Sequence, residues 1–311
     1  MGAPAAAGSE WNAMNSEIAA IRKALAQNPP TAGSFADRRL RWEPLFHKIC
    51  PIPAGTEVRS IAAGGPAGEW VSAAGVSADE TRILFYIHGG GFTAGSAAAY
   101  RGLSAHLSAA TGARVLAVDY RWAPEAPFPA ALEDCVAGYR WLITTAAAAP
   151  RRVVLVGDSA GGNLVVAILL ALKQAGDALP AAGVCLSAIF DLALTGDSVT
   201  SRAQRDPMIL ASSLQSCASA YRGNADPRDP LMSPLYGDLS GLPPLLLQCG
   251  SEEMLRDDSV RLAAKAKAAG VDVTFEEWDE MVHVWHLFAD RLTAGRKALA
   301  RIGEFVRAHI E

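Results

Sequence analysis

The chain has 311 residues, of which half are hydrophobic and 19% are charged, and this composition excludes a disordered or fibrous protein. The formal net charge is -4 and no basic cluster stands out, which argues against nucleic acid as a partner. The five cysteines are scattered without C-x-x-C spacing, so we expect reduced core thiols and neither a disulfide framework nor a zinc site.

The start of the chain carries no recognisable targeting signal. Residues 1–8 lack a cationic region, and Glu10 precedes any apolar stretch. The longest strongly apolar run, 164–172, is far shorter than the roughly 20 residues that span a bilayer. We therefore expect no signal peptide, no membrane span and a cytoplasmic protein.

The first half of the chain changes from helical to extended patterns. Helices are predicted at 11–27 and 35–48, separated by Asn28, Pro29 and Pro30. They form either a lid over a site elsewhere or an extension packed on the surface. Strands at 57–62 and 69–73 are predicted to form an antiparallel hairpin, and an almost unbroken apolar strand follows at 82–87.

The second half alternates strands with helices. Strands are predicted at 114–119, 153–156, 183–189, 245–249 and 271–278, and helices at 129–145, 163–173, 257–269 and 290–309. This order predicts an α/β fold, with a mostly parallel sheet of about eight strands and helices on both faces. Residues 191–234 are too long for an ordinary connection and carry a helical pattern at 209–221. We expect this insertion, with the N-terminal helices, to cover the C-terminal ends of the strands.

A candidate nucleophile lies between one such strand and its helix. Residues 157–161 read Gly-Asp-Ser-Ala-Gly, which fits the G-x-S-x-G elbow that lifts a serine hydroxyl clear of the sheet. Small residues let strand and helix pass closely, and the helix N-terminus favours negative charge. The alternative is an ordinary glycine-rich loop. Ser159 is therefore a candidate that needs partners.

Donors for an oxyanion follow the strand at 82–87. The sequence His-Gly-Gly-Gly-Phe at 88–92 allows backbone N–H groups to turn toward a developing negative charge, and the N–H of Ala160 is a further donor. The alternative is a turn without function, which the pairing with an elbow disfavours.

The best placed of the six histidines is His283, just after the last predicted strand and before the final helix. His286 is interpreted as a partly buried helical ring and His88 as a residue that shapes the glycine loop. The remaining histidines, in helical patterns, are interpreted as structural or solvated: His47, His106 and His309.

The acid that orients the base is expected after the strand at 245–249. Four carboxylates compete there, and their spacing alone does not choose among them: Glu252, Glu253, Asp257 and Asp258. The two aspartates also suit a helix N-terminus, and Asp191 is an outside candidate. The order serine, acid, histidine matches the α/β-hydrolase order.

From about residue 80 onward the sequence resembles the bacterial hormone-sensitive lipase family of α/β-hydrolase esterases. The resemblance rests on the glycine loop at 88–92, on Asp-Tyr-Arg-Trp-Ala-Pro-Glu at 119–125, on the elbow at 157–162 and on Asp-Pro-Leu-Met-Ser-Pro at 229–234. It implies an N-terminal helical cap segment at 1–50 and a catalytic domain at 51–311 with a cap insertion at about 191–234.

The resemblance also implies roles for single residues. The family's Asp-Pro-Leu-x-Asp-Glu motif aligns with 253–258, so the orienting acid falls on Glu253, where most relatives have aspartate. The oxyanion donors map to Gly90, Gly91 and Ala160. The implied reaction is two-step acyl transfer on short-chain esters by Ser159, without metal or organic cofactor.

Four apolar residues are expected to line the substrate pocket, or to be plain core: Phe92, Trp122, Ile189 and Trp285. Two other functions use the same fold. One is an amidase or carbohydrate deacetylase, and the other is a ligand receptor without turnover, which the presence of His283 disfavours. The resemblance also suggests a homodimer formed through an exposed edge of the sheet.

Overall fold

The computed structural model describes residues 5–311, with side chains from residue 16 onward. Residues 1–4, on which the prediction about a signal peptide also depends, lie outside the described residues. The described chain forms an eight-stranded sheet in the order β1-β2-β4-β3-β5-β6-β7-β8. The strands are β1 (Glu57–Ser60), β2 (Gly68–Ser72), β3 (Ile83–Ile87), β4 (Arg114–Val118), β5 (Val153–Asp158), β6 (Ala182–Leu186), β7 (Leu245–Gly250) and β8 (Val273–Trp278). The β1–β2 and β2–β4 pairs are antiparallel and the other pairs are parallel, which confirms the predicted α/β sheet.

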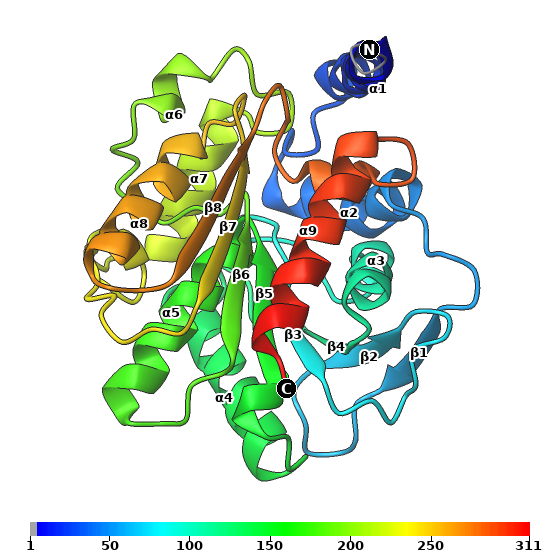
Figure 1. Ribbon diagram of the computed structural model, residues 1–311. Coiled ribbons are helices and arrows are strands. Elements are labelled where there is room, and N and C mark those ends of the chain that lie inside the picture. The colour runs from blue at the N-terminus through cyan, green and yellow to red at the C-terminus, as the bar shows by residue number, and fades with distance from the viewer. Residues whose placement is uncertain (1–4) are drawn as a thin grey trace.

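Helices cover both faces of this sheet. They are α1 (Ala5–Gln27), α2 (Phe35–Ile49), α3 (Arg101–Thr111), α4 (Ala130–Thr144), α5 (Ala160–Ala175), α6 (Ser198–Ser201), α7 (Ala211–Arg222), α8 (Arg256–Ala268) and α9 (Thr293–His309). Short 3-10 helices are found at η1 (Pro150–Arg152), η2 (Pro234–Tyr236) and η3 (Trp285–Phe288). Figure 1 shows α3 and α9 packed together on one face and α4, α5 and α8 on the other. Among the described residues, no helix combines the length and the apolarity needed to cross a bilayer.

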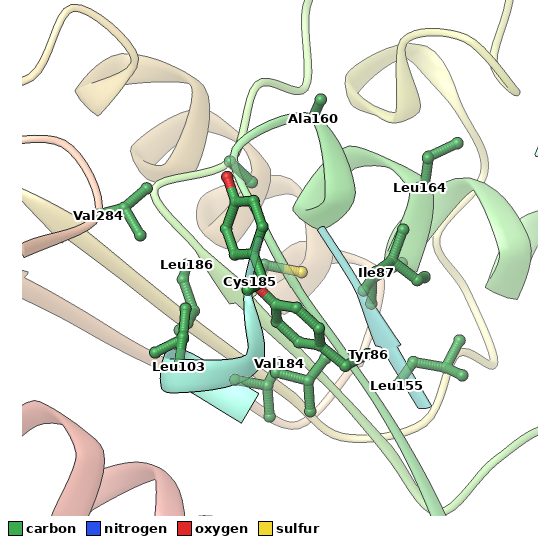
Figure 2. Packing of buried hydrophobic residues seen from close by; sticks show 14 of the residues in the cluster. Tyr86, Ile87, Leu103, Leu155, Ala160, Leu164, Val184, Cys185, Leu186 and Val284 are labelled. Carbon is green, nitrogen blue, oxygen red and sulfur yellow. The ribbon is translucent and has the colours of Figure 1, made fainter. Parts of the chain in front are cut away.

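The core forms because the central strands are apolar on both faces. Every residue of β3 and β5 is buried, as expected for parallel strands with helices on each side. Figure 2 shows Tyr86 and Ile87 of β3, Leu155 of β5 and Val184 of β6 packed in the core, with Leu164 of α5. Burying a side chain such as Leu164 stabilises the fold by about 1.5–3 kcal/mol.

The N-terminal helices and the insertion lie where the parallel strands end (Figure 1). The two segments contact each other, because Thr31 Oγ1 donates to the carbonyl of Met208 at 3.1 Å and Ser213 Oγ donates to the carbonyl of Thr31 at 2.6 Å. The insertion is also joined to the loop after β7, since Asp206 Oδ2 accepts the N–H of Met254 at 3.0 Å. The division into a cap segment at 1–50, a catalytic domain at 51–311 and an insertion at about 191–234 stays a proposal.

Two features differ from the elements expected along the sequence. Helix α3 was indicated only by the helical pattern around His106, without bounds, and it packs closely at Gly102, where a Cβ would lie 2.1 Å from the carbonyl oxygen of Cys50. The closing helix begins at Thr293 and not at residue 290, because the chain first forms the 3-10 turn η3.

Candidate active site

Ser159 occupies a strained turn between β5 and α5. Its backbone has φ 53° and ψ −117°, a conformation that costs a non-glycine residue on the order of 1–3 kcal/mol. The turn fits because a Cβ on Gly161 would lie 1.9 Å from the carbonyl oxygen of Ile87, so only glycine allows the helix to approach β3 this closely. The Ser159 N–H donates to the carbonyl of Leu186 at 2.8 Å and holds the turn against β6. Ser159 therefore has the strand–turn–helix setting that the sequence predicts.

The glycine loop supplies backbone donors beside this turn. The carbonyl of Gly90 accepts the N–H groups of Thr93 and Ala94 at 3.1 and 3.2 Å, and Gly90 has φ 109° in the region that favours glycine. Among the described residues, no backbone acceptor is found for the N–H groups of Gly90 and Gly91. Ala160 opens α5, where a first-turn N–H has no acceptor within the helix. These three N–H groups are available to an anionic oxygen.

Asp158 joins the glycine loop to the serine turn. Its Oδ1 accepts the Tyr86 hydroxyl at 2.5 Å and the N–H of Gly89 at 2.9 Å. Burial raises the pKa of Asp158 to about 6, although the hydrogen bond from Tyr86 and the charge of His283 act in the opposite direction. Asp158 belongs to the Gly-Asp-Ser-Ala-Gly motif at 157–161, but nothing in the sequence indicates its contact with Gly89, which is 69 residues away.

His283 and Glu253 form a buried pair. His283 Nδ1 lies 2.9 Å from Glu253 Oε2, and Glu253 is completely buried. Glu253 Oε1 accepts the Ser187 hydroxyl at 2.7 Å and also the N–H of Gly250. With Nδ1–H donating to the carboxylate, Nε2 of His283 is left as the acceptor that a general base requires.

The electrostatics of this pair follow from burial and from charge. The pKa of Glu253 lies above its ordinary value, because the effect of burial outweighs the hydrogen bond and charge of His283 and the donors Gly250 and Ser187, which all lower it. For His283, burial disfavours the cation, but the hydrogen bond and charge of Glu253, together with Asp206 and Asp158, outweigh it and raise its pKa. The imidazolium is thus stabilised in place.

Ser187 is a positioning residue that sequence reasoning missed. Its hydroxyl donates to Glu253 and accepts the N–H of Val284 at 2.9 Å, so one side chain fixes both the acid and the backbone just after the base. Ser187 follows β6, and no motif in the sequence marks it. Only the fold brings the ends of β6, β7 and β8 together.

The competing carboxylates have other partners. Glu252, next to Glu253, is buried and binds Arg22 of α1 at 3.2 Å and Arg205 of the insertion at 2.6 Å. Asp257 accepts the N–H of Ser198 at 2.9 Å. Asp258 accepts the N–H groups of Phe190 and Asp191, and it forms an ion pair with Arg261 at 2.9 Å, as Asp191 does at 3.1 Å. Within the described chain, Glu253 is the carboxylate of this loop that contacts His283.

The other histidines near the site have structural contacts. His286 Nε2 bonds Gln248 Oε1 at 2.8 Å, and burial lowers its pKa to about 3. His88 Nδ1 bonds the carbonyl of Gly89 at 2.7 Å, with the ring stacked on Tyr120 at 4.4 Å. His88 shapes the loop, as the sequence suggests. Among residues 16–311, no group of three or more His, Cys, Asp or Glu side chains is arranged to hold a metal ion.

A cavity joins these parts, with a volume of about 70 Å³. Ser159, His283, Gly90 and Gly91 line it, and the remainder of the wall comes largely from apolar residues of the two cap segments: Trp42, Phe46, Met208, Ile209, Leu214 and Ala218. The candidate nucleophile and base therefore open onto one space beneath the cap.

The predicted pocket residues divide into two pairs. Phe92 and Ile189 line the cavity. Trp122 and Trp285 are not among the residues that line it, and Trp285 is plain core, which was the alternative expectation. The guanidinium carbon of Arg39 lies 4.9 Å from the ring centre of Trp122. Trp285 is fully buried, and its ring centre lies 5.8 Å from that of Trp278.

Comparisons with known proteins agree with this fold. A family model described as the alpha/beta hydrolase fold matches residues 84–287. An acetyl-hydrolase of Streptomyces hygroscopicus is 49% identical over 295 residues, covering 94% of this chain and 96% of that protein. An esterase of Acinetobacter venetianus is 35% identical, covering 89% and 90%. A crystal structure of an esterase from the bacterial hormone-sensitive lipase family superposes with a TM-score of 0.88 at 44% identity, covering 96% of this chain and 99% of that one.

The fold and these relatives define a carboxylic ester hydrolase. More narrowly, the chain belongs to the bacterial hormone-sensitive lipase family of α/β-hydrolase esterases.

Proposed function

We propose that the chain is a carboxylesterase that hydrolyses short-chain acyl esters through Ser159, His283 and Glu253 and a covalent acyl-enzyme. The observation that carries this proposal is the 2.9 Å contact between His283 Nδ1 and the buried Glu253, at a histidine that shares its cavity with Ser159. A serine hydroxyl is a weak nucleophile until a base takes its proton, and the base works best when a third group fixes its tautomer.

The steps follow from these positions. His283 Nε2 takes the proton of Ser159 as its Oγ attacks the ester carbonyl, and Glu253 stabilises the imidazolium that forms. The N–H groups of Gly90, Gly91 and Ala160 stabilise the oxyanion. His283 then gives its proton to the leaving alcohol. A water molecule, deprotonated by the same imidazole, attacks the acyl-enzyme, and the acid is released with Ser159 regenerated.

The preference for short acyl chains rests on the size of the cavity. A volume of about 70 Å³ is far below the roughly 300–1,000 Å³ of pockets that enclose drug-sized ligands. The walls contributed by Leu214 and Ile209 come from the insertion and limit the length of chain that fits. We expect kcat/KM to be highest for acetyl to butyryl esters.

The test is a series of 4-nitrophenyl esters from acetate to dodecanoate, with a matched anilide, compared by kcat/KM for the wild type and for Ser159→Ala. Loss of the nucleophile should lower kcat by about 10⁶-fold. Full activity of Ser159→Ala would overturn the proposed nucleophile, and a maximum at long chains would overturn the short-chain preference.

The second candidate is an acetyl-hydrolase that acts on an amide or a carbohydrate acetate with the same residues. It is favoured by the relative from Streptomyces hygroscopicus, which bears that name. Turnover of the anilide, or of an acetylated sugar, above that of the simple esters would support it. A receptor without turnover is disfavoured because His283 is present and is bonded to Glu253.

Two further proposals concern the state of the protein. We propose a cytoplasmic location and a homodimer formed through an edge strand of the sheet, where β1 is exposed along its whole length. Cell fractionation tests the first and light scattering of the purified chain tests the second.

A further inference from the structure

One charged side chain in the cavity has no role in the proposed reaction. Arg38 of α2 is only 3% exposed and lines the same cavity as Ser159 and His283. Among the described residues no carboxylate lies within ion-pair distance of it, and its Nε has no hydrogen-bond partner. Burying a cation without an anion costs several kcal/mol, so this arrangement needs an explanation.

The contacts that Arg38 does make compensate little of that cost. Its guanidinium lies 4.6 Å from the ring centre of Phe35, and Nη1 lies 3.1 Å from the sulfur of Cys217. A cation–π contact and a weak sulfur acceptor do not replace a carboxylate. Arg38 also lies near the start of α2, which is capped at Ser34, and the positive end of a helix dipole disfavours a cation. The site therefore carries uncompensated positive charge.

Arg38 is close to the place where the reaction would occur. Cys217 lies between Arg38 and the glycine loop. Its sulfur is 3.1 Å from Nη1 of Arg38 and would lie 2.8 Å from a Cβ placed on Gly91. Most of the other residues that line the cavity are apolar, such as Trp42 and Leu214, and the carboxyl group of Asp158 among them accepts hydrogen bonds from Tyr86 and Gly89. In such surroundings a guanidinium binds a carboxylate strongly, through a fork of parallel N–H donors.

We propose that the substrates of this enzyme are esters that carry a carboxylate, and that Arg38 binds that carboxylate as a specificity-determining residue. This inference rests on the proposed esterase reaction and names its substrate class. Arg38 supplies an anion-binding position in a cavity that is otherwise suited to a short apolar acyl group.

The test compares neutral and anionic esters of equal length. 4-Nitrophenyl hydrogen glutarate is matched with 4-nitrophenyl valerate, which places the carboxylate on the acyl side, and 3-acetoxybenzoate is matched with phenyl acetate, which places it on the alcohol side. We expect the wild type to prefer the anionic ester in one of the two pairs. Arg38→Met should lower that preference roughly 10- to 100-fold, mainly through KM, and Arg38→Lys should restore part of it. The matched control is Arg41→Met, because Arg41 is an exposed arginine of the same helix, and it should leave the preference unchanged.

Two outcomes separate this proposal from the proposed function. If the wild type hydrolyses neutral esters at least as well in both pairs, or if Arg38→Met weakens neutral and anionic esters equally, Arg38 has a structural role and this proposal is wrong while the esterase stands. If the wild type hydrolyses none of the four esters, the esterase proposal fails, and calorimetry still tests Arg38. The Ser159→Ala protein should bind 4-nitrophenyl hydrogen glutarate or 3-acetoxybenzoate more tightly than the Ser159→Ala/Arg38→Met protein does, and equal binding of both ligands would overturn the inference.

Discussion

Replacing Ser187 by alanine tests whether the environment of the acid sets the properties of the base. The change removes the hydroxyl that donates to Glu253 at 2.7 Å and leaves the buried N–H of Val284 without its 2.9 Å acceptor. A hydrogen bond to a charged group contributes about 1.5–3 kcal/mol, and an unsatisfied buried donor costs about 1–3 kcal/mol. We expect the free energy of unfolding to fall by roughly 3–5 kcal/mol.

Catalysis should also change, in a way that a loss of stability alone does not produce. If half of that energy is lost from the transition state, kcat falls roughly 10- to 100-fold, since each 1.36 kcal/mol is tenfold. Glu253 loses one donor and becomes more basic, so it should raise the pKa of His283 further. The acid limb of kcat/KM should therefore move to higher pH.

The control for this prediction is Ser108→Ala. Ser108 is equally buried and also makes two hydrogen bonds, from the N–H of Ala73 at 3.0 Å and to the carbonyl of Ala113 at 2.8 Å, but neither partner belongs to the site, whereas the partners of Ser187 are Glu253 and Val284. It should lose stability without any change in kcat or in the pH profile. The reasoning about Ser187 is refuted if both variants lose stability and neither changes the pH dependence of a 4-nitrophenyl ester assay.

The remaining predictions concern Glu253 and the core. Wild-type kcat/KM should rise with pH through an apparent pKa above the ordinary 6.5 of histidine, because His283 must be neutral to act as base and its pKa is raised. Glu253→Gln removes the charge that stabilises the imidazolium, so the acid limb of kcat/KM should move to lower pH and kcat should fall roughly 10³- to 10⁴-fold. Asp257→Asn should change neither. If Asp257→Asn had these effects and Glu253→Gln did not, Glu253 would not be the acid that orients His283. Leu164→Ala removes a completely buried side chain and should cost about 2–5 kcal/mol in denaturant unfolding, and a loss under about 1 kcal/mol would contradict the packing shown in Figure 2.

The sheet could be predicted from the sequence because its strands carry their own signal. The run at 82–87 is apolar after Arg82 and the run at 153–156 is apolar throughout, which is the pattern of strands buried on both faces, and both form central strands. Helix α3 carries a weaker signal, the helical pattern around His106, because it is rich in small residues such as Gly102 and Ala105 and owes its position to packing. Tertiary contact, and not intrinsic preference, decides this element.

The candidate site was predictable as far as order along the chain allowed. The order of Ser159 and His283 along the chain matches that of the α/β-hydrolases. Four carboxylates stayed equivalent as candidates for the acid until the resemblance to the family selected Glu253. Trp285 shows the limit of proximity in sequence, because it follows His283 by two residues yet points into the core. Val284 adopts a left-handed conformation, with φ 48° and ψ 48°, and turns the chain between them. A backbone reversal of this kind at a β-branched residue is not readable from composition.

The ion pairs of Glu252 have a consequence for how this protein can be recombined with its relatives. Arg22 and Arg205 come from the two cap segments, and both meet a carboxylate that directly precedes Glu253, while Asp206 holds the N–H that follows it. A chimera that imports a foreign insertion without Arg205 and Asp206 would remove an ion pair of the buried Glu252 and the acceptor of the Met254 N–H, on either side of Glu253. When segments are exchanged between relatives, the insertion should therefore be transferred together with the loop after β7, although the two are separated along the sequence.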